Sequence, residues 1–312
     1  MITVQLVQHK VTQRGGCSAV RATQSDTAQW LQRGMIQRGD RSAVVAVQND
    51  VARWLQRGGI NVRILRHINS MYRWYTNAKV CYAYLHDVDG SSFPSEKDDK
   101  KYAKSYGWPE WFSRGWTLQE MIAPIDVQFF NQNWQTIGTK KALSKTLSKI
   151  TRVPERILTD GLDGNRPCVA RIMSWAANRT TTRVEDRAYS LMGLLDVNMP
   201  MLYGEGKKAF HRLQLEIIRS SNDQSIFAWG HTSNVRIGSI LADDPSFFRD
   251  CFNMSLMGHD EFIEESNENF PELGSMDAGD GVFPVTNRGI QIRMLLHPYF
   301  ESKSVFRAYL PC

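Results

Sequence analysis

The sequence predicts an α/β fold: an incomplete layered core rich in helices, with a small C-terminal extension that contains β-strands. Two short runs rich in β-forming residues, 79–88 and 126–131, are typical of buried strands. Between and after them, apolar residues recur with the period of amphipathic helices. Strands that bracket several helices favour an α/β layered core, and 312 residues are enough to bury one.

The first predicted elements lie between residues 62 and 107. The folded part begins near Val62 with an amphipathic helix. The apolar face of this helix consists of Ile64, Ile68, Met71 and Tyr75. The strand over 79–88 ends at the turn Asp89-Gly90, and the polar residues that follow, as far as 107, predict a surface loop.

Two helices are predicted in the middle of the chain. Residues 115–122 form a short one, which Pro124 stops because proline lacks a backbone N–H group and cannot continue a helix. After the strand at 126–131, the lysine-rich run 139–150 is typical of an exposed amphipathic helix.

Three more helices and a strand are predicted after residue 160. Pro167 suits the first turn of the first helix. The residues TRVE are typical of a capping box at the start of the second, with Thr182 as N-cap and Glu185 reaching back to it. The third helix covers 206–221, and 225–229 favour a strand. The inward faces of the three helices consist of Val169, Ile172, Met173 and Ala176, of Val184, Ala188, Leu191 and Leu195, and of Phe210, Leu213 and Ile217.

Both ends of the chain have unusual charge. Residues 1–67 carry ten Lys or Arg and three Asp, a net charge of 10 − 3 = +7, whereas the remainder has 28 basic and 29 acidic residues, a net charge of −1. A basic arm can bind nucleic acid or an anionic membrane, but 1–61 lack a known nucleic-acid motif, so we expect a poorly packed arm without a nucleic-acid partner. Residues 260–280 carry eight acids and no Lys or Arg, which predicts a mobile surface loop.

The basic arm contains an internal repeat. Segments 18–34 and 42–58 are identical at 12 of 17 positions. Two copies are too few for a self-supporting repeat array, so a recent tandem duplication or an error in the gene model explains the segment as well as a function does.

The cysteine pattern favours a cytosolic or nuclear protein, and we expect a cytoplasmic one without a metal or cofactor. The five cysteines are scattered, with no CxxC pair, which fits reduced thiols better than a disulfide framework. The histidines lack metal-ligand spacing, so we expect no zinc site. No apolar run approaches the length of a membrane span.

A candidate polar site is built from two dense motifs, at 111–124 and 182–187. Its members are Arg114, Trp116, Glu120, Arg183, Glu185, Asp186 and Arg187. In a structural interpretation, Arg187 pairs with Glu120 or Asp186, and such buried pairs set geometry without adding much stability. In a functional one, Arg114, Glu120 and Arg187 line a polar pocket that holds a nucleotide or an acidic group. We expect Trp116 to be largely buried, and Arg114 and Glu120 to face the start of the second motif, where an arginine can pair with Glu120.

The sequence LYGEGKK offers a weaker anion-binding candidate. A turn bounded by Gly204 and Gly206 opens a helix and is followed by Lys207, and free backbone N–H groups at such a turn can bind an anion. The sequence is neither GxGxxG nor a Walker A motif, so the alternative is that the glycines merely permit a tight loop.

Several of these segments together resemble the fungal heterokaryon incompatibility (HET) domain. They are INSMYRWYTNAKVCYAYLHDV, WFSRGWTLQEMIAP, and the run from MSWAANRTTTRVEDRAYS to the end of SIFAW. The segments GSILADDPSFFRDC and VTNRGIQIRMLL resemble the extension known as domain of unknown function 8212. This resemblance predicts a HET-like domain over 62–229 and an extension over 230–312. It also implies a distant likeness to the TIR (flavodoxin-like) fold.

The sequence departs from the family pattern at both ends. The strand with which such domains usually open is replaced by the basic repeat, and the extension stops at FRAYLPC. We therefore expect a HET protein that lacks its first third, with a truncated extension.

The resemblance implies a module of non-self recognition whose activation leads to growth arrest or cell death. Its partners are then other proteins or further copies of itself. The alternative is a TIR-like enzyme that cleaves NAD, the only cofactor considered. That chemistry needs a carboxylate beside the nicotinamide ribose, and the segment that would hold it is replaced here, so we favour the non-enzymatic interpretation.

Overall fold

The computed structural model describes residues 3–6, 71–164, 166–230, 240–269, 283–286, 289–292, 295–298 and 306–312. The chain divides into two compact units, Met1–Gly161 and Leu162–Cys312. The domain boundaries predicted at 61 and 229 differ from this division at 161, and they remain predictions. The internal repeat lies outside the described residues.

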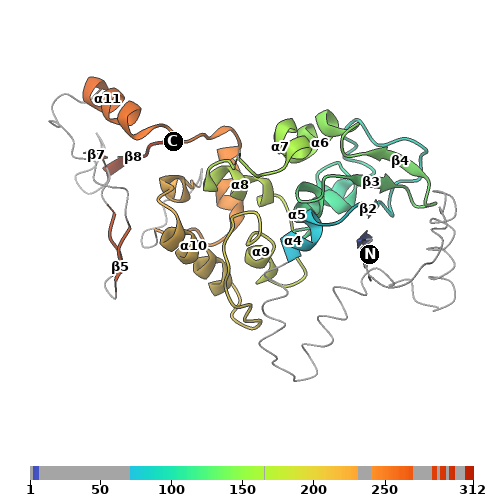
Figure 1. The fold of residues 1–312 in the computed structure, drawn as a ribbon, viewed down its shortest axis with the longest axis horizontal. Coiled ribbons are helices and arrows are strands. Elements are labelled where there is room, and N and C mark those ends of the chain that lie inside the picture. Colours follow the sequence, from blue (N-terminus) through green and yellow to red (C-terminus); the bar gives the residue numbers. More distant parts are fainter. Residues whose placement is uncertain are drawn as a thin grey trace, which may run out of the picture. The chain divides into compact units, whose positions relative to one another are not determined.

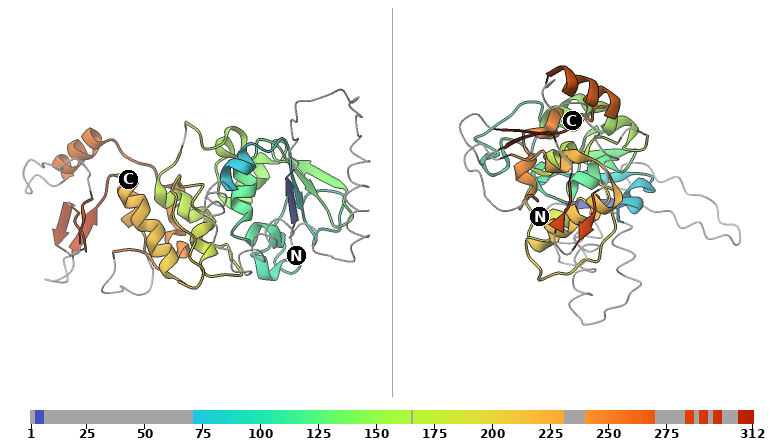
Figure 2. Two further views of the ribbon diagram at one scale, coloured as in Figure 1. Left: turned by 60° about the horizontal axis from the view of Figure 1, so that its bottom comes forward. Right: turned by 90° about the vertical axis from the view of Figure 1, so that its left-hand side faces the viewer.

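The first unit is built on a four-stranded sheet with the order β1-β2-β3-β4 (Figures 1 and 2). The strands are β1 (Thr3–Leu6), β2 (Cys81–Tyr84), β3 (Val127–Phe130) and β4 (Thr136–Thr139). The β2–β3 pair is parallel, with Cys81 opposite Val127, and both outer pairs are antiparallel. A parallel pair requires a long crossover, which here carries helical segments. The mixed α/β class is confirmed.

Short helices surround this sheet. They are α4 (Met71–Thr76), η1 (Ala103–Ser105), η2 (Glu110–Ser113), α5 (Thr117–Ile122), α6 (Ser144–Thr151) and α7 (Glu155–Asp160). The core beside β3 is aromatic: the ring of Trp111 lies 5.7 Å from that of Phe129 in an edge-to-face arrangement, and both side chains are fully buried. Such pairs add stability beyond the area they bury.

The second unit is mainly helical. It contains α8 (Val169–Ala176), α9 (Asp186–Tyr189), α10 (Lys208–Ser220), η3 (Gln224–Phe227), η4 (Pro245–Phe248), η5 (Cys251–Asn253) and α11 (His259–Asn269). In this unit α9 packs against α10, and α8 packs against η4 and η5 (Figure 2). Gln214 of α10 ties this helix to the next segment, because its side-chain amide exchanges hydrogen bonds of 2.7 and 2.9 Å with the backbone of Ala242.

Two short hairpins complete the second unit. Strand β5 (Val285–Thr286) pairs with β6 (Gly289–Ile290), and β7 (Leu295–Pro298) pairs with β8 (Phe306–Tyr309), both antiparallel. Both hairpins fall in the region for which the sequence predicts a β-containing extension.

Strongly periodic elements agree with prediction. The strands at 79–88 and 126–131 and the helices at 115–122, 139–150 and 206–221 are present with shorter or shifted ends, and α8 follows Pro167 as expected. Four predictions about these elements are wrong. Residues 225–229 begin with the 3-10 helix η3 and form no strand, and the acidic stretch begins with the helix α11. Glu185 does not close a capping box, and Val184, which was predicted on an inward helix face, precedes α9 and is 52% exposed. Asp260 and Glu261 favour α11 because acids in a first turn complement the helix dipole. The remainder of that stretch, from 270 to 280, lies outside the described residues.

None of the helices in the described part of the chain has the length and apolar content needed to cross a membrane. Among the same residues, no group of three or more His, Cys, Asp or Glu side chains is placed to hold a metal ion.

Candidate functional site

The predicted polar site is divided between the two units. Arg114, Trp116 and Glu120 belong to the first unit, whereas the residues from Arg183 to Arg187 belong to the second. Each group therefore has to be described by its contacts within its own unit.

In the first unit, Glu120 lies on α5, a helix whose residues are all buried. Its carboxylate accepts a hydrogen bond of 3.0 Å from the hydroxyl of Tyr75 on α4, and both residues are buried. Burial and the neighbouring carboxylate raise the pKa of Tyr75 well above its usual value, so this phenol stays a hydrogen-bond donor. The side chain of Trp116 is intermediate in burial, neither fully buried nor exposed. Arg114 lies 3.9 Å from the carboxylate of Glu110, at the protein surface.

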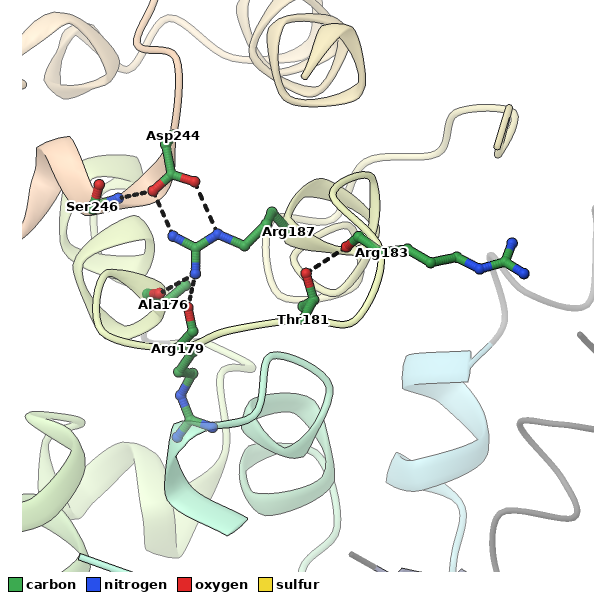
Figure 3. Close-up of polar contacts among 7 residues, drawn as sticks. All are labelled: Ala176, Arg179, Thr181, Arg183, Arg187, Asp244 and Ser246. Carbon is green, nitrogen blue, oxygen red and sulfur yellow. Dashed lines mark hydrogen bonds and ion pairs between the residues drawn. The ribbon is translucent and has the colours of Figure 1, made fainter. Parts of the chain in front are cut away.

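In the second unit, Arg187 of α9 binds Asp244 in a bidentate ion pair (Figure 3). Its Nε lies 2.9 Å from Oδ2 of Asp244, and its Nη2 lies 2.5 Å from Oδ1. The third nitrogen donates to the carbonyl oxygens of Ala176, the last residue of α8, and of Arg179, which follows the helix. Arg187 thereby joins three segments. The prediction that it pairs with Glu120 or Asp186 is wrong.

Asp244 is the residue that sequence reasoning missed. Its Oδ1 also accepts a hydrogen bond of 2.9 Å from the backbone N–H of Ser246, so it caps η4, with Pro245 in the first turn. Burial acts to raise the pKa of Asp244, but the hydrogen bonds and charge of Arg187 outweigh burial and lower it. The sequence Asp-Pro-Ser is a recognisable helix start, but it does not identify the arginine, which lies 57 positions away.

Glu185 occupies the loop that was the candidate anion site. Its Oε1 accepts hydrogen bonds of 2.8 Å from the N–H of Gly204 and 3.0 Å from that of Gly206. Burial acts to raise the pKa of Glu185, but its own backbone N–H, those of the two glycines, and the charge of Arg183 together lower it. The predicted N–H cradle therefore exists, and in this structure it holds a carboxylate of the same chain.

Two tyrosines join the same motifs a second time. The hydroxyl of Tyr203 donates to Asp186 at 2.9 Å, and the guanidinium of Arg183 lies over the Tyr203 ring, 4.4 Å from its centre. The hydroxyl of Tyr189 donates to Glu205 at 2.7 Å. Desolvation and these carboxylates raise the pKa of both phenols. The polar atoms of the RVEDR and LYGEG segments are therefore largely used to hold the two segments together.

The same junction exposes apolar side chains. Val184 and Leu202 are each 52% exposed, and the exposed Tyr203 follows Leu202. We call these three residues the junction surface. Lys207 and Lys208 are exposed beyond it. Large exposed apolar groups rimmed by polar ones are typical of protein contact sites.

Comparison with known proteins supports the resemblance found in the motifs. Residues 208–278 match the family described as domain of unknown function DUF8212. Over 155 residues, 48% of this chain, the sequence is 43% identical to the vegetative incompatibility protein HET-E-1 of Podospora anserina. The match spans only 11% of that much longer protein. No solved structure matches the chain. The similarity to a fungal heterokaryon incompatibility protein with a DUF8212 region is confirmed.

Proposed function

From this similarity to a heterokaryon incompatibility protein, we propose that the chain is a non-self recognition module whose activation promotes growth arrest or cell death in the fungal cytoplasm. The observation that carries the proposal is the 43% identity to HET-E-1 over about half of the chain. The relative's printed name refers to vegetative incompatibility, and cell death is our extension of that role.

The module acts through contacts with other proteins or with further copies of itself. Its polar candidates are engaged within their own units: Glu185 by two backbone N–H groups, and Arg187 by Asp244. The apolar junction surface is what this region presents to solvent. Burial of such side chains at a contact is favourable, at about 25 cal/mol per Å².

A TIR-like core and action without a cofactor are part of the same proposal. The parallel β2–β3 pair with its helical crossover suits a layered α/β core of that kind. The alternative of an NAD-cleaving enzyme receives no support from the similar proteins, so we do not develop it.

Regulated expression in a filamentous fungus tests the proposal. We expect induction of the chain to slow colony growth and to increase uptake of a vital dye, and Leu202→Ser to weaken both effects. Leu256→Ser is the matched control, because Leu256 is also 52% exposed in the second unit but lies outside the junction surface. Normal growth at high levels of the unaltered chain would contradict the signalling role, and equal effects of the two variants would contradict the role of the junction surface.

A further inference from the structure

A row of lysines follows one face of α6 in the first unit. Lys141, Lys145 and Lys149 are spaced four residues apart and all are exposed. Lys145 and Lys149 lie on α6 itself, and Lys141 lies in the turn that precedes it, where the backbone N–H of Leu143 bonds to the carbonyl of Thr139 at 2.9 Å. Side chains four apart share a helix face, and the buried Leu147 lies on the opposite one. The lysine row therefore faces away from the core.

The charge of this row is not balanced locally. Over 141–160 the exposed cations are the three lysines, Arg152 and Arg156, and the acids are Glu155 and Asp160, a net charge of 5 − 2 = +3. In the part of the chain that the structure describes, none of the three lysines forms a salt bridge. An unpaired cationic row attracts anions over about a Debye length.

An exposed isoleucine lies beside the start of the row. Ile125 is 79% exposed, the highest value among the large apolar residues described. Its neighbour Pro124 is held by the ammonium of Lys140, which donates to the Pro124 carbonyl, and the Lys140 N–H bonds to Val127 at 2.8 Å. The segment that carries Ile125 is therefore fixed against the residue that precedes Lys141.

We propose that this face docks on an anionic lipid membrane surface, with the lysine row on the headgroups and Ile125 at the boundary of the acyl chains. Cations combined with a protruding aliphatic group fit a surface that is charged outside and apolar beneath. Single-stranded nucleic acid fits less well, because residues 139–156 contain no aromatic side chain on which bases could stack.

Binding to lipid vesicles tests the docking face in the full chain. We expect tighter binding to vesicles that mix phosphatidylcholine with phosphatidylserine than to phosphatidylcholine alone. Each lysine near an anionic surface contributes about fivefold in affinity, so Lys145→Gln with Lys149→Gln weakens binding to the mixed vesicles by about thirtyfold. Lys100→Gln with Lys104→Gln is the matched control, because it removes two other exposed lysines of the same unit and leaves the basic N-terminal region unchanged. We expect that control to bind like the unaltered chain.

Ile125 separates a lipid surface from other polyanions. We expect Ile125→Ser to weaken binding to the mixed vesicles at least threefold while leaving binding to heparin unchanged. Equal binding to the two kinds of vesicle, equal loss in the two double variants, or an Ile125→Ser variant that binds mixed vesicles normally would each overturn the proposal. Tighter binding to a single-stranded oligonucleotide than to the mixed vesicles would indicate nucleic acid in place of lipid.

Discussion

Removal of the Asp244 carboxylate should destabilise the second unit measurably. In the Arg187–Asp244 pair, the arginine side chain is 14% exposed and the aspartate side chain 33% exposed. Breaking a fully buried pair costs about 3–5 kcal/mol, whereas an exposed pair contributes about 0–1 kcal/mol. Because this pair lies between these limits and Arg187 keeps two carbonyl acceptors, we expect Asp244→Asn to cost about 2 kcal/mol. Asp244→Ala also removes the cap of η4, which adds about 1 kcal/mol.

Urea unfolding followed by circular dichroism measures these differences. A double-mutant cycle with Arg187→Met should give a coupling energy of about 1–2 kcal/mol, since the two residues share one network. Two results would refute the reasoning: a coupling energy near zero, or a cost of Asp244→Ala below about 0.5 kcal/mol.

The same pair should make stability sensitive to acid. The pKa of Asp244 is lowered in the folded protein, so its contribution is present above the unfolded pKa of about 3.9 and is lost as the pH falls through the folded pKa. The stability advantage of the unaltered chain over Asp244→Asn should therefore shrink below about pH 4.

Three further predictions concern other buried charges. Glu185→Gln should cost about 1.5–3 kcal/mol in urea unfolding, because a charged acceptor of two N–H groups is lost, while Glu96→Gln, a control at an exposed loop position, should change stability by less than about 0.5 kcal/mol. Burial lowers the pKa of Lys140 to about 8. Between pH 8 and 10.5 the unfolded chain then binds more protons than the folded chain, so the folded state gains stability as the pH rises. Relative to Lys140→Met, the unaltered chain should gain about 3 kcal/mol of unfolding free energy over that range. A stability difference that does not change with pH would refute the lowered pKa. Tyr75→Phe removes a donor to the buried Glu120, and calorimetry should show a loss of about 1.5–3 kcal/mol, whereas an unchanged melting curve would contradict that hydrogen bond.

The elements that the sequence predicts well are those whose signal is local. Apolar residues at helical spacing predict α8 and α10, and a run of β-forming residues predicts β3. Helix α7 and strand β4 were missed, because each is too short to display a clear period.

The contacts of the candidate site show why local patterns are not enough. Thr182 and Glu185 have the spacing of a capping box, but the Glu185 carboxylate is taken by Gly204 and Gly206, about 20 residues further along the chain. Two backbone donors in a preformed turn satisfy a carboxylate better than the single N–H of a frayed helix start. Asp244, the partner of Arg187, lies 57 positions away from it in the sequence. Local sequence patterns do not predict contacts over such a separation.

The ion pair between Arg187 and Asp244 limits where recombination can separate the coding sequence without harm to the fold. The arginine lies before residue 229, where the HET-like segment was predicted to end, and its aspartate lies after it; Gln214 and Ala242 span the same position. A recombination event that transfers only 62–229 to another protein would separate the mostly buried guanidinium of Arg187 from its carboxylate and leave the buried amide of Gln214 without its backbone partner. The two stretches are expected to be inherited together, and a fusion or expression boundary is better placed well beyond Phe248 than at 229.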